Sequence, residues 1–317
     1  MRIVGISDLV TDVYYDEEMN IIGAFGGISC CNIVCNLEYF GFDTFIYGAC
    51  GNDYLGKIAI DSLNDCNVKN DIRIMDNVKT NSYPILKVKE NNRDAFRSIK
   101  YCPFCKESTW YEGSYIDEED ILKKIRKEDI LVFDNLNSKN QYIIDNTNNI
   151  KLLDLGGINE FESLDNDTII NKLANKFTII NLNERVEKYL MKRLNCSNTI
   201  ELSKIINSKL LIVTRGAKGN DFVYDNEIYS FPVENVVKEV DDSGAGDIFF
   251  SIIIRNWLNN KMVFDTQLFN KWVDDTKPYI EMVLQMIGSR SFIYPMYQVK
   301  KEDICSNIKT KKLTREI

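Results

Sequence analysis

Short runs of apolar residues, rich in Ile and Val, recur along the chain and alternate with longer mixed segments. The runs are nearly continuous and lack the polar alternate positions of a strand with one face in water. Segments of helical length separate several of them, which favours parallel strands covered by helices on both faces. The predicted strands are residues 2–6, 44–47, 130–133, 151–155, 177–180 and 210–214. We therefore expect an α/β fold with a mostly parallel central sheet flanked by helices.

Two segments, residues 11–24 and 82–112, break this rhythm because they alternate more and contain turn-like sequences. We expect both to be antiparallel pieces that project from the main sheet as a small β lid over a cleft, with an ordinary edge hairpin as the alternative. Residues 32–40 are predicted to be helical up to Gly41, a residue type common at helix C-termini. The whole chain, 1–317, is expected to be one domain with a charged, partly disordered tail over 300–317.

The amino-acid composition argues against several classes of function and cellular location. With 44% hydrophobic residues the chain has enough apolar side chains for a large core, and its net charge of -8 argues against nucleic acid as a partner. No apolar run reaches the roughly 18 residues of a membrane span, so we expect no membrane partner and a cytoplasmic location. The nine cysteines are odd in number and form no disulfide framework.

The chain contains no histidine. This excludes Ser-His-Asp and Cys-His nucleophiles, histidine metal ligands and histidine proton shuttles. A general base must therefore be Asp, Glu, Lys, Tyr or Cys.

One run of small and acidic residues carries the clearest chemistry. Asp241-Asp242-Ser243-Gly244-Ala245-Gly246-Asp247 precedes an apolar segment with helical character. A small-residue turn that opens a helix aims several backbone N–H groups at one point, where the helix dipole also favours an anion. Asp247, in the first turn, is placed to accept a proton from an attacking hydroxyl. Taken alone, the run is also consistent with a plain glycine-rich helix start.

The run resembles the second signature of the ribokinase-like (PfkB) carbohydrate kinases, Asp-Thr-x-Gly-Ala-Gly-Asp, with Asp242 in place of Thr. Further elements of that family follow in its order. They are Asp12, Gly26-Gly27 with Asn32 and Gly41, the segment 47–56, Asn181-Leu182-Asn183-Glu184, and the turn 213–219. The spacing from Gly27 to Asn32 is one residue longer than the family's, and Ile252 stands where a small residue often follows the signature.

The resemblance implies a ribokinase-like fold and ATP-dependent phosphorylation of a hydroxyl on a small sugar or sugar derivative. It implies Asp247 as the catalytic base and Gly244, Ala245 and Gly246 as the amides that hold the transferring phosphoryl group. The implied acceptor residues are Asp12, Gly26, Gly27 and Asn32, and those for ATP are Asn181, Thr214, Gly216 and Gly219. Glu184 would organise Mg²⁺ through water. Asp241 and Ser243 would bind a monovalent cation such as K⁺, and a homodimer through the lid is implied by relatives.

Three alternatives remain open at this point. A nucleoside kinase of the same fold needs only a different acceptor. A non-catalytic sugar or nucleotide sensor is suggested by Asp242 and by the longer spacing before Asn32. A phosphosugar kinase needs extra cations near the acceptor, for which Lys89, Arg93 and Arg97 are candidates; solvated lysine and arginine are equally expected there.

Two other stretches resemble known motifs for phosphate or metal binding but lack some of the residues that those motifs need. The stretch 51–58 nearly matches a phosphate-binding P-loop, but Ile58 leaves no hydroxyl for Mg²⁺. Cys102-Pro103-Phe104-Cys105 has metal-ligand spacing, yet no second pair and no histidine complete a four-ligand zinc site. We expect these two cysteines to be structural or incidental thiols.

Overall fold

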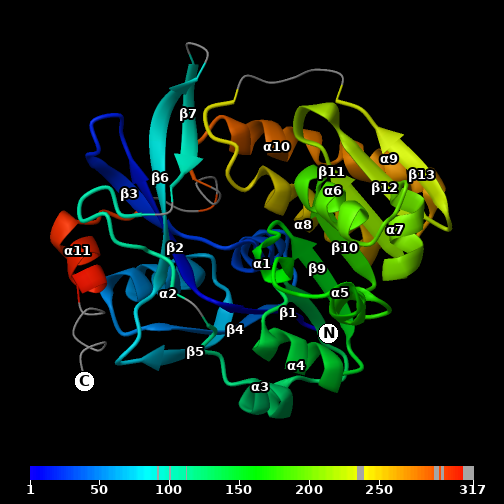
Figure 1. Cartoon of the computed structure of the whole chain (residues 1–317), viewed down its shortest axis with the longest axis horizontal. Helices are drawn as coiled ribbons and strands as arrows, with labels where there is room; N and C mark the ends of the chain where they lie inside the picture. The colour runs from blue at the N-terminus through cyan, green and yellow to red at the C-terminus, as the bar shows by residue number, and fades with distance from the viewer. Residues whose placement is uncertain are drawn as a thin grey trace.

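The computed structural model describes residues 1–90, 93–99, 101–111, 113–233, 239–288, 293 and 296–309, without the side chains of 90, 93–94 and 306–309. Its centre is a nine-stranded sheet in the order β13-β12-β11-β10-β9-β8-β1-β4-β5 (Figure 1). The seven strands from β11 to β5 pair in parallel, and β12 and β13 continue the sheet antiparallel. The bounds are β1 Ile3–Asp8, β4 Thr44–Gly51, β5 Lys69–Met75, β8 Ile130–Phe133, β9 Ile150–Leu155, β10 Ile179–Asn183, β11 Leu210–Thr214, β12 Asn220–Tyr224 and β13 Glu227–Phe231.

Helices cover both faces of this sheet, as its buried strands require. One core lies between the sheet and α3 to α7, and the other lies between the sheet and α1, α8 and α9. The bounds are α1 Ser29–Tyr39, α2 Tyr54–Asp65, α3 Glu118–Lys124, α4 Ser138–Asn146, α5 Asn166–Leu173, α6 Glu184–Arg193, α7 Thr199–Ile206, α8 Ala245–Asn259, α9 Thr266–Asp274, α10 Lys277–Leu284 and α11 Lys301–Lys309. Two 3₁₀ turns, η1 Asn159–Phe161 and η2 Gly216–Lys218, complete the set.

The two segments that break the apolar rhythm form a second sheet, in the order β3-β2-β6-β7, which we call the lid sheet. Figure 1 shows β6 and β7 rising from the body of the molecule. Each segment is an antiparallel pair, as predicted, but the two are joined by parallel pairing of β2 with β6. The bounds are β2 Val10–Tyr15, β3 Ile21–Gly26, β6 Asn81–Glu90 and β7 Arg93–Ser98.

The first helix and the C-terminal segment extend differently from their predicted bounds. The helix predicted over 32–40 begins three residues earlier, at Ser29, and ends before Gly41, whose φ of 87° explains the glycine there. Within the tail that was predicted to be partly disordered, residues 301–309 form α11, and Ile304 is buried in a small core with lid residues such as Val13 and Tyr15. Residues 310–317 lie outside the described part of the chain.

Candidate functional site

The predicted site residues gather where the parallel strands end and where α1 and α8 begin. Asp247 lies in the first turn of α8 and is buried. The Asn32 side-chain amide, on α1, donates a 2.6 Å hydrogen bond to one carboxylate oxygen of Asp247. Asn36 and Ser251, one turn further along the two helices, are also hydrogen-bonded at 3.2 Å. The packing of α1 on α8 therefore fixes the orientation of the Asp247 carboxylate, and the longer spacing before Asn32 does not displace that residue.

The turn that opens α8 has the form predicted for an anion site. Gly244 adopts φ 81°, the left-handed region that favours glycine, and no side chain among the described residues caps the helix. A Cβ added at Gly246 would meet no atom of the described residues within 4 Å. The backbone therefore faces open space next to Asp247, as a phosphate-binding turn requires.

Asp241 is buried behind this turn, where it organises the backbone. Its two carboxylate oxygens accept hydrogen bonds from the N–H groups of Ser243 at 3.0 Å and Gly288 at 2.8 Å. The buried Tyr14 hydroxyl, from the lid sheet, lies beside both Asp241 and Ser243. Burial raises the Tyr14 pKa well above its usual range, so this hydroxyl stays protonated. A monovalent cation at Asp241 and Ser243 stays a prediction.

The acceptor residues predicted near the N-terminus lie around the start of α1. A Cβ at Gly27 would come within 2.5–2.7 Å of the Asp12 carboxylate, so only glycine lets Asp12 approach. The Gly26 N–H donates to Ser62 Oγ at 2.9 Å and thereby ties β3 to α2. Ile28 takes φ 70°, which is rare for a β-branched residue, in the segment with the longer spacing.

Two carboxylates of this site were missed by the sequence analysis. Asp134 follows β8, and its carboxylate accepts a 2.9 Å hydrogen bond from the Cys30 N–H. Asp134 therefore caps the start of α1, although it lies far from α1 in the sequence. Asp154, in β9, accepts the Asn181 side-chain amide at 2.6 Å. Desolvation, together with the nearby Asp247, raises the pKa of Asp134 to about 6 and that of Asp154 to about 7. In the sequence, Asp134 and Asp154 could have been found as acidic residues that lie directly after or inside an apolar strand.

The predicted ATP residues line the ends of β10 and β11. Asn181 is buried, and its Oδ1 has no hydrogen-bond partner among the described residues. Thr214 ends β11, and the turn after it closes through a bond from Arg215 N to Gly219 O at 2.9 Å. Gly219 has φ 103°, and a Cβ there would strike the Phe231 carbonyl at 2.0 Å. Gly216, with φ 55°, faces open space instead.

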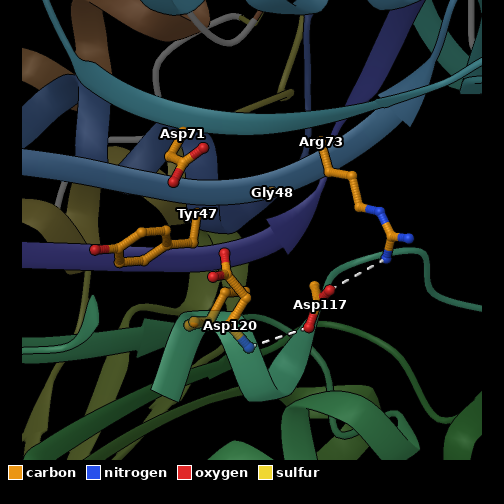
Figure 2. A pocket seen from close by; sticks show the side chains of 7 residues that line it. Tyr47, Gly48, Asp71, Arg73, Asp117 and Asp120 are labelled. Carbon is orange, nitrogen blue, oxygen red and sulfur yellow. Dashed lines mark hydrogen bonds and ion pairs between the residues drawn. The ribbon is translucent and has the colours of Figure 1, made fainter. Parts of the chain in front are cut away.

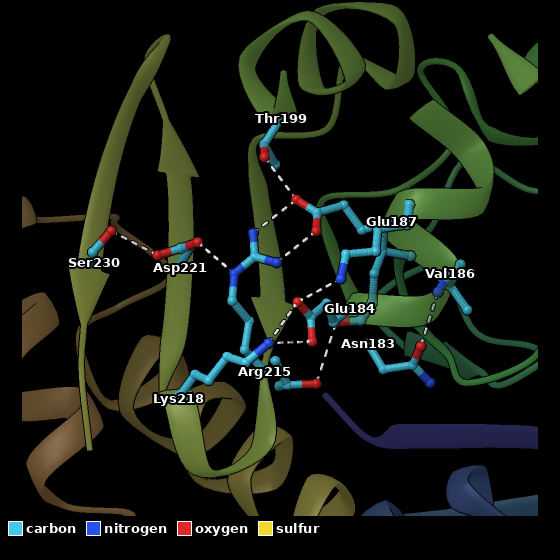
Figure 3. Close-up of polar contacts among 12 residues, drawn as sticks. Asn183, Glu184, Val186, Glu187, Thr199, Arg215, Lys218, Asp221 and Ser230 are labelled. Carbon is cyan, nitrogen blue, oxygen red and sulfur yellow. Dashed lines mark hydrogen bonds and ion pairs between the residues drawn. The ribbon is translucent and has the colours of Figure 1, made fainter. Parts of the chain in front are cut away.

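An ion-pair network holds this turn in place, as Figure 3 shows. Arg215 donates to both oxygens of Glu187 at 2.6 and 2.8 Å and to Asp221 at 2.7 Å. Thr199 Oγ1 donates to Glu187 at 2.6 Å. Because the Glu187 carboxylate is buried and fully paired, the network joins α6, α7 and β12 to the turn.

Glu184 lies at the first position of α6, beside the same turn. Its carboxylate accepts from Lys188 at 2.8 Å and from Lys218 at 3.1 and 3.2 Å. These two lysines lower the Glu184 pKa to about 2. Its role in organising Mg²⁺ stays a prediction.

The lid sheet brings one cation, Arg97, and the aromatic ring of Tyr83 toward the predicted site. Arg97, on β7, lies 3.9 Å from the carboxylate of Asp242. Lys89 pairs with Glu17 at 3.5 Å, and the Arg93 side chain lies outside the described residues. Tyr83, the register partner of Asp12 in the lid sheet, stacks on Trp110 with ring centroids 4.8 Å apart. An aromatic surface and an acidic side chain therefore lie beside each other.

Comparison with known proteins decides the family. A family model described as pfkB family carbohydrate kinase matches residues 24–267, which include Asn32, the 213–219 turn and the 241–247 motif. The chain belongs to the pfkB carbohydrate kinase family. No curated protein matches the chain.

Solved structures of several small-molecule kinases share the fold of this family member at low sequence identity. The aminoimidazole riboside kinase of Salmonella enterica, solved with aminoimidazole riboside and an ATP analogue, matches with TM-score 0.69 and 15% identity over 97% of this chain and 100% of its own. The Methanocaldococcus jannaschii nucleoside kinase matches with TM-score 0.67 and 12% identity over 97% and 98%. Vibrio cholerae fructokinase, solved with fructose, ADP and calcium, matches with TM-score 0.66 and 15% identity over 97% and 98%. The predicted ribokinase-like fold is confirmed.

A surface pocket of about 280 Å³ in this pfkB-family chain lies between α3 and the strands β4 and β5 (Figure 2). None of its lining residues is a predicted site residue. Its carboxylates are already paired, since Lys124 contacts Asp71 and Asp120 while Arg73 lies 3.7 Å from Asp117. The charged residues described around the pocket are therefore already paired with one another.

The two other sequence motifs have different outcomes. In the P-loop-like stretch, the Asp53 carboxylate accepts the N–H groups of Gly56 and Thr80 at 2.8 and 2.9 Å, so the protein itself fills the anion position. Cys102 and Cys105 gain a neighbour that the sequence did not indicate, because α11 brings Cys305 to them.

In the described part of the chain, no helix is long and apolar enough to span a membrane.

Proposed function

We propose that this pfkB-family protein transfers the γ-phosphoryl group of ATP to a hydroxyl of a small sugar or sugar derivative. The observation that carries the proposal is the position of Asp247. Its buried carboxylate is oriented by Asn32 and lies in the first turn of α8, directly after the uncapped Gly-Ala-Gly turn. A carboxylate that could accept a proton is thus adjacent to a turn suited to an anion, and this arrangement supports phosphoryl transfer.

In the proposed reaction, Asp247 accepts the proton of the acceptor hydroxyl. The hydroxyl oxygen forms a bond to the γ-phosphorus, and the bond from that phosphorus to the bridging oxygen breaks, so that ADP leaves with the electron pair. The amides of Gly244, Ala245 and Gly246 hold the negative charge of the transferring group. The proton passes from Asp247 to solvent after the product has left.

Several features of the chain support a nucleotide beside this turn. Asn181 Oδ1 is buried without a partner among the described residues, so a ligand donor would satisfy it. Gly216 and Gly246 both face open space where a side chain would obstruct a phosphate. Glu184, beside the 213–219 turn, would organise Mg²⁺ through water, because Mg²⁺ prefers oxygen donors and keeps part of its water shell. When bound, Mg²⁺ supplies positive charge to the phosphates.

The acceptor would lie against Asp12, Gly27 and Asn32, beneath the lid sheet. Asp12 and Asn32 are buried polar side chains of the kind that bind sugar hydroxyls. The Tyr83–Trp110 stack beside Asp12 would contact the apolar face of a sugar ring. A nucleobase would suit the same aromatic surface, and for this reason a nucleoside is the second acceptor class.

Replacing Asp247 by Asn tests the proposal. The substitution keeps the size and the hydrogen-bonding shape of the side chain but removes the base. We expect kcat to fall by about 100- to 10,000-fold, the usual contribution of general base catalysis. ADP release over a panel of sugars, sugar phosphates and nucleosides measures it, and calorimetry with a non-hydrolysable ATP analogue is expected to give an unchanged affinity.

The matched control is Asp167→Asn, an exposed carboxylate in the first turn of another helix, α5. This variant should retain full activity. A near-normal rate for Asp247→Asn would overturn the assignment of the base. Intact ligand binding with no ADP release by the wild type over the whole panel would instead indicate a non-catalytic sensor.

A further inference from the structure

Three cysteines from distant parts of the chain meet at the base of the lid sheet. Cys102 and Cys105 follow β7, and Cys305 lies on α11. The three sulfur atoms all lie within 4.8 Å of one another. Figure 1 shows α11 against the lid side of the molecule, well away from the elements that hold the ATP residues. The cluster is therefore separate from the site described above.

The backbone between the first two cysteines forms a turn around the Cys102 sulfur. The Lys106 N–H donates to the Cys102 carbonyl at 3.0 Å, and the Cys102 N–H donates to the Glu107 carbonyl at 2.9 Å. The N–H groups of Phe104 and Cys105 donate toward the Cys102 sulfur. Lys106 takes φ 60°, which lets the chain reverse directly after Cys105. Burial raises the pKa of Cys102 to about 11, which the N–H groups of Phe104 and Cys105 only partly offset, so the Cys102 thiol keeps its proton until a metal ion binds.

Packing holds all three sulfur atoms in place. Cys102 is fully buried, and Phe104 makes an edge contact with Tyr15 of the lid sheet at 5.7 Å between ring centroids. Ile304, next to Cys305, is buried in the same small core. The Lys301 ammonium lies 4.7 Å above the Phe104 ring and brings positive charge to the cluster. The arrangement is therefore fixed by elements from the lid sheet and from α11.

We infer that Cys102, Cys105 and Cys305 form a zinc site. A Zn–S bond of about 2.3 Å in tetrahedral geometry puts sulfur atoms about 3.8 Å apart, a separation that small side-chain rotations reach from the present positions. The three thiols lose their protons to solvent as the ion binds. A water molecule occupies the fourth position. Three thiolates and Zn²⁺ leave one net negative charge, which Lys301 offsets.

This inference explains why a third cysteine is present. A disulfide within Cys102-Pro103-Phe104-Cys105 would use two sulfur atoms and leave the third without a role. The ion would join the segment after β7 to the C-terminal helix and so fix the base of the lid sheet. It takes no part in the proposed reaction, and the inference does not depend on the proposed function.

The test measures metal content of the full chain. Protein purified in reductant is loaded with Zn²⁺, freed of excess ion by desalting and analysed by mass spectrometry for metals. We expect about one zinc per chain for the wild type and for Cys196→Ser, a control thiol outside the cluster. Cys305→Ser, at a half-exposed position on α11, is expected to lose at least nine-tenths of the zinc.

Cobalt reports the ligand set independently. Co²⁺ bound by thiolates gives a sulfur-to-cobalt charge-transfer band and strong tetrahedral visible bands, which should appear in the wild type and be lost or shifted in Cys305→Ser. Three results would overturn the inference. They are no zinc in the wild type, the same zinc content and cobalt spectrum in Cys305→Ser, or a Cys102–Cys105 disulfide found by mass spectrometry in the reduced preparation.

Discussion

Asp242 places a carboxylate beside the proposed phosphate-binding turn, 244–246, at the position where the pfkB signature has threonine. Alone, this charge would repel the phosphates of a bound nucleotide. In the structure Arg97 reaches it from the lid sheet, with a nitrogen 3.9 Å from the carboxylate. Both side chains are largely exposed, so the pair contributes only about 0.2–1 kcal/mol. Its main effect is to cancel a charge next to the turn and to connect the lid sheet to it.

Replacing Arg97 by Gln should therefore raise the KM for ATP by about 1.5- to 5-fold, since the charge of Asp242 is then uncompensated. Adding Asp242→Thr should return the KM to the wild-type value, because the charge to be compensated is gone. Steady-state ADP release measures both variants. Lys89→Gln is the matched control, as this lid cation pairs with Glu17 instead. Equal KM values in the single and double variants would contradict the pairing.

The largely buried carboxyl group of Glu160 should make the free energy of unfolding depend on pH. It accepts the Leu136 N–H, and burial raises its pKa to about 7. The unfolded chain loses this proton near pH 4.5 while the native state keeps it, so this group's contribution to stability falls as pH rises from about 5 to 8. The total change is up to about 3 kcal/mol.

Glu160→Gln removes that dependence because glutamine keeps the acceptor oxygen without a titrating proton. The free energy of unfolding in urea, measured from pH 5 to 8, should fall for the wild type relative to the variant. Glu162→Gln, an exposed neighbour, is expected to track the wild type. A constant difference between wild type and Glu160→Gln over this range would show that the Glu160 pKa is not raised.

At the scale of elements, the turn after β11 depends on contacts from outside itself. Arg215 is held by Glu187 from α6 and Asp221 from β12, and Thr199 from α7 completes the pairing of Glu187. The turn that carries Gly216 is therefore fixed by three neighbouring elements. Disturbing the network should affect both the stability of the fold and the binding of a nucleotide.

Glu187→Gln should lower the free energy of unfolding by about 1.5–3 kcal/mol, because a buried charged hydrogen-bond pair is broken while Arg215 keeps Asp221. In urea the midpoint should fall with an unchanged slope. The KM for ATP should rise more than kcat falls, since the turn is proposed to bind the nucleotide and not the acceptor. Glu162→Gln serves again as the exposed control. An unchanged midpoint would contradict this account of the network.

Elements with a strong local pattern were predictable from sequence, whereas long-range partners were not. The strands at 130–133 and 210–214 were predicted with the bounds that the structure shows, because buried parallel strands are continuously apolar. The parallel pairing of β2 with β6 was missed, since alternation within a segment says nothing about its distant partner. The contact of Asn32 with Asp247 follows from helix packing, yet the family resemblance had already placed both in the site.

The residues missed in the sequence are those whose role arises only from tertiary contacts. Asp134 caps a helix about a hundred positions earlier in the chain, and Cys305 meets the Cys102–Cys105 pair through α11. No motif connects such positions in one sequence. Burial near other charges then changes the protonation of Asp134 and Asp154, which local composition cannot indicate.

At the scale of the whole molecule, the lid sheet has two edges of different character. The β3 edge is covered, since Ala24 and Tyr297 exchange backbone hydrogen bonds at 2.8 and 2.9 Å. On the outer edge of β7, no strand pairs within the parts of the chain that are described. An open strand edge is a ready surface for pairing with a second copy.

We therefore expect a homodimer that pairs through the lid sheet at β7. Sedimentation equilibrium over a range of concentrations should give twice the chain mass, with dissociation on dilution if the interface is small. Cross-linking through cysteines introduced on β7 distinguishes this edge from other contacts. A single chain mass at every concentration would contradict the prediction.

The lid sheet can form only after strands that are far apart in the sequence have been made. Its two hairpins are separated along the chain by α1, β4, α2 and β5, and they meet only through the pairing of β2 with β6. Contacts of such long sequence separation assemble slowly, because the intervening loop must first be closed. During synthesis, β2 can therefore pair with β3 at once, but its other edge stays unpaired until β6 has left the ribosome. The lid sheet is therefore complete once β7 has been made, before β8 to β13 of the central sheet, and its two hairpins depend on the elements that lie between them in the chain.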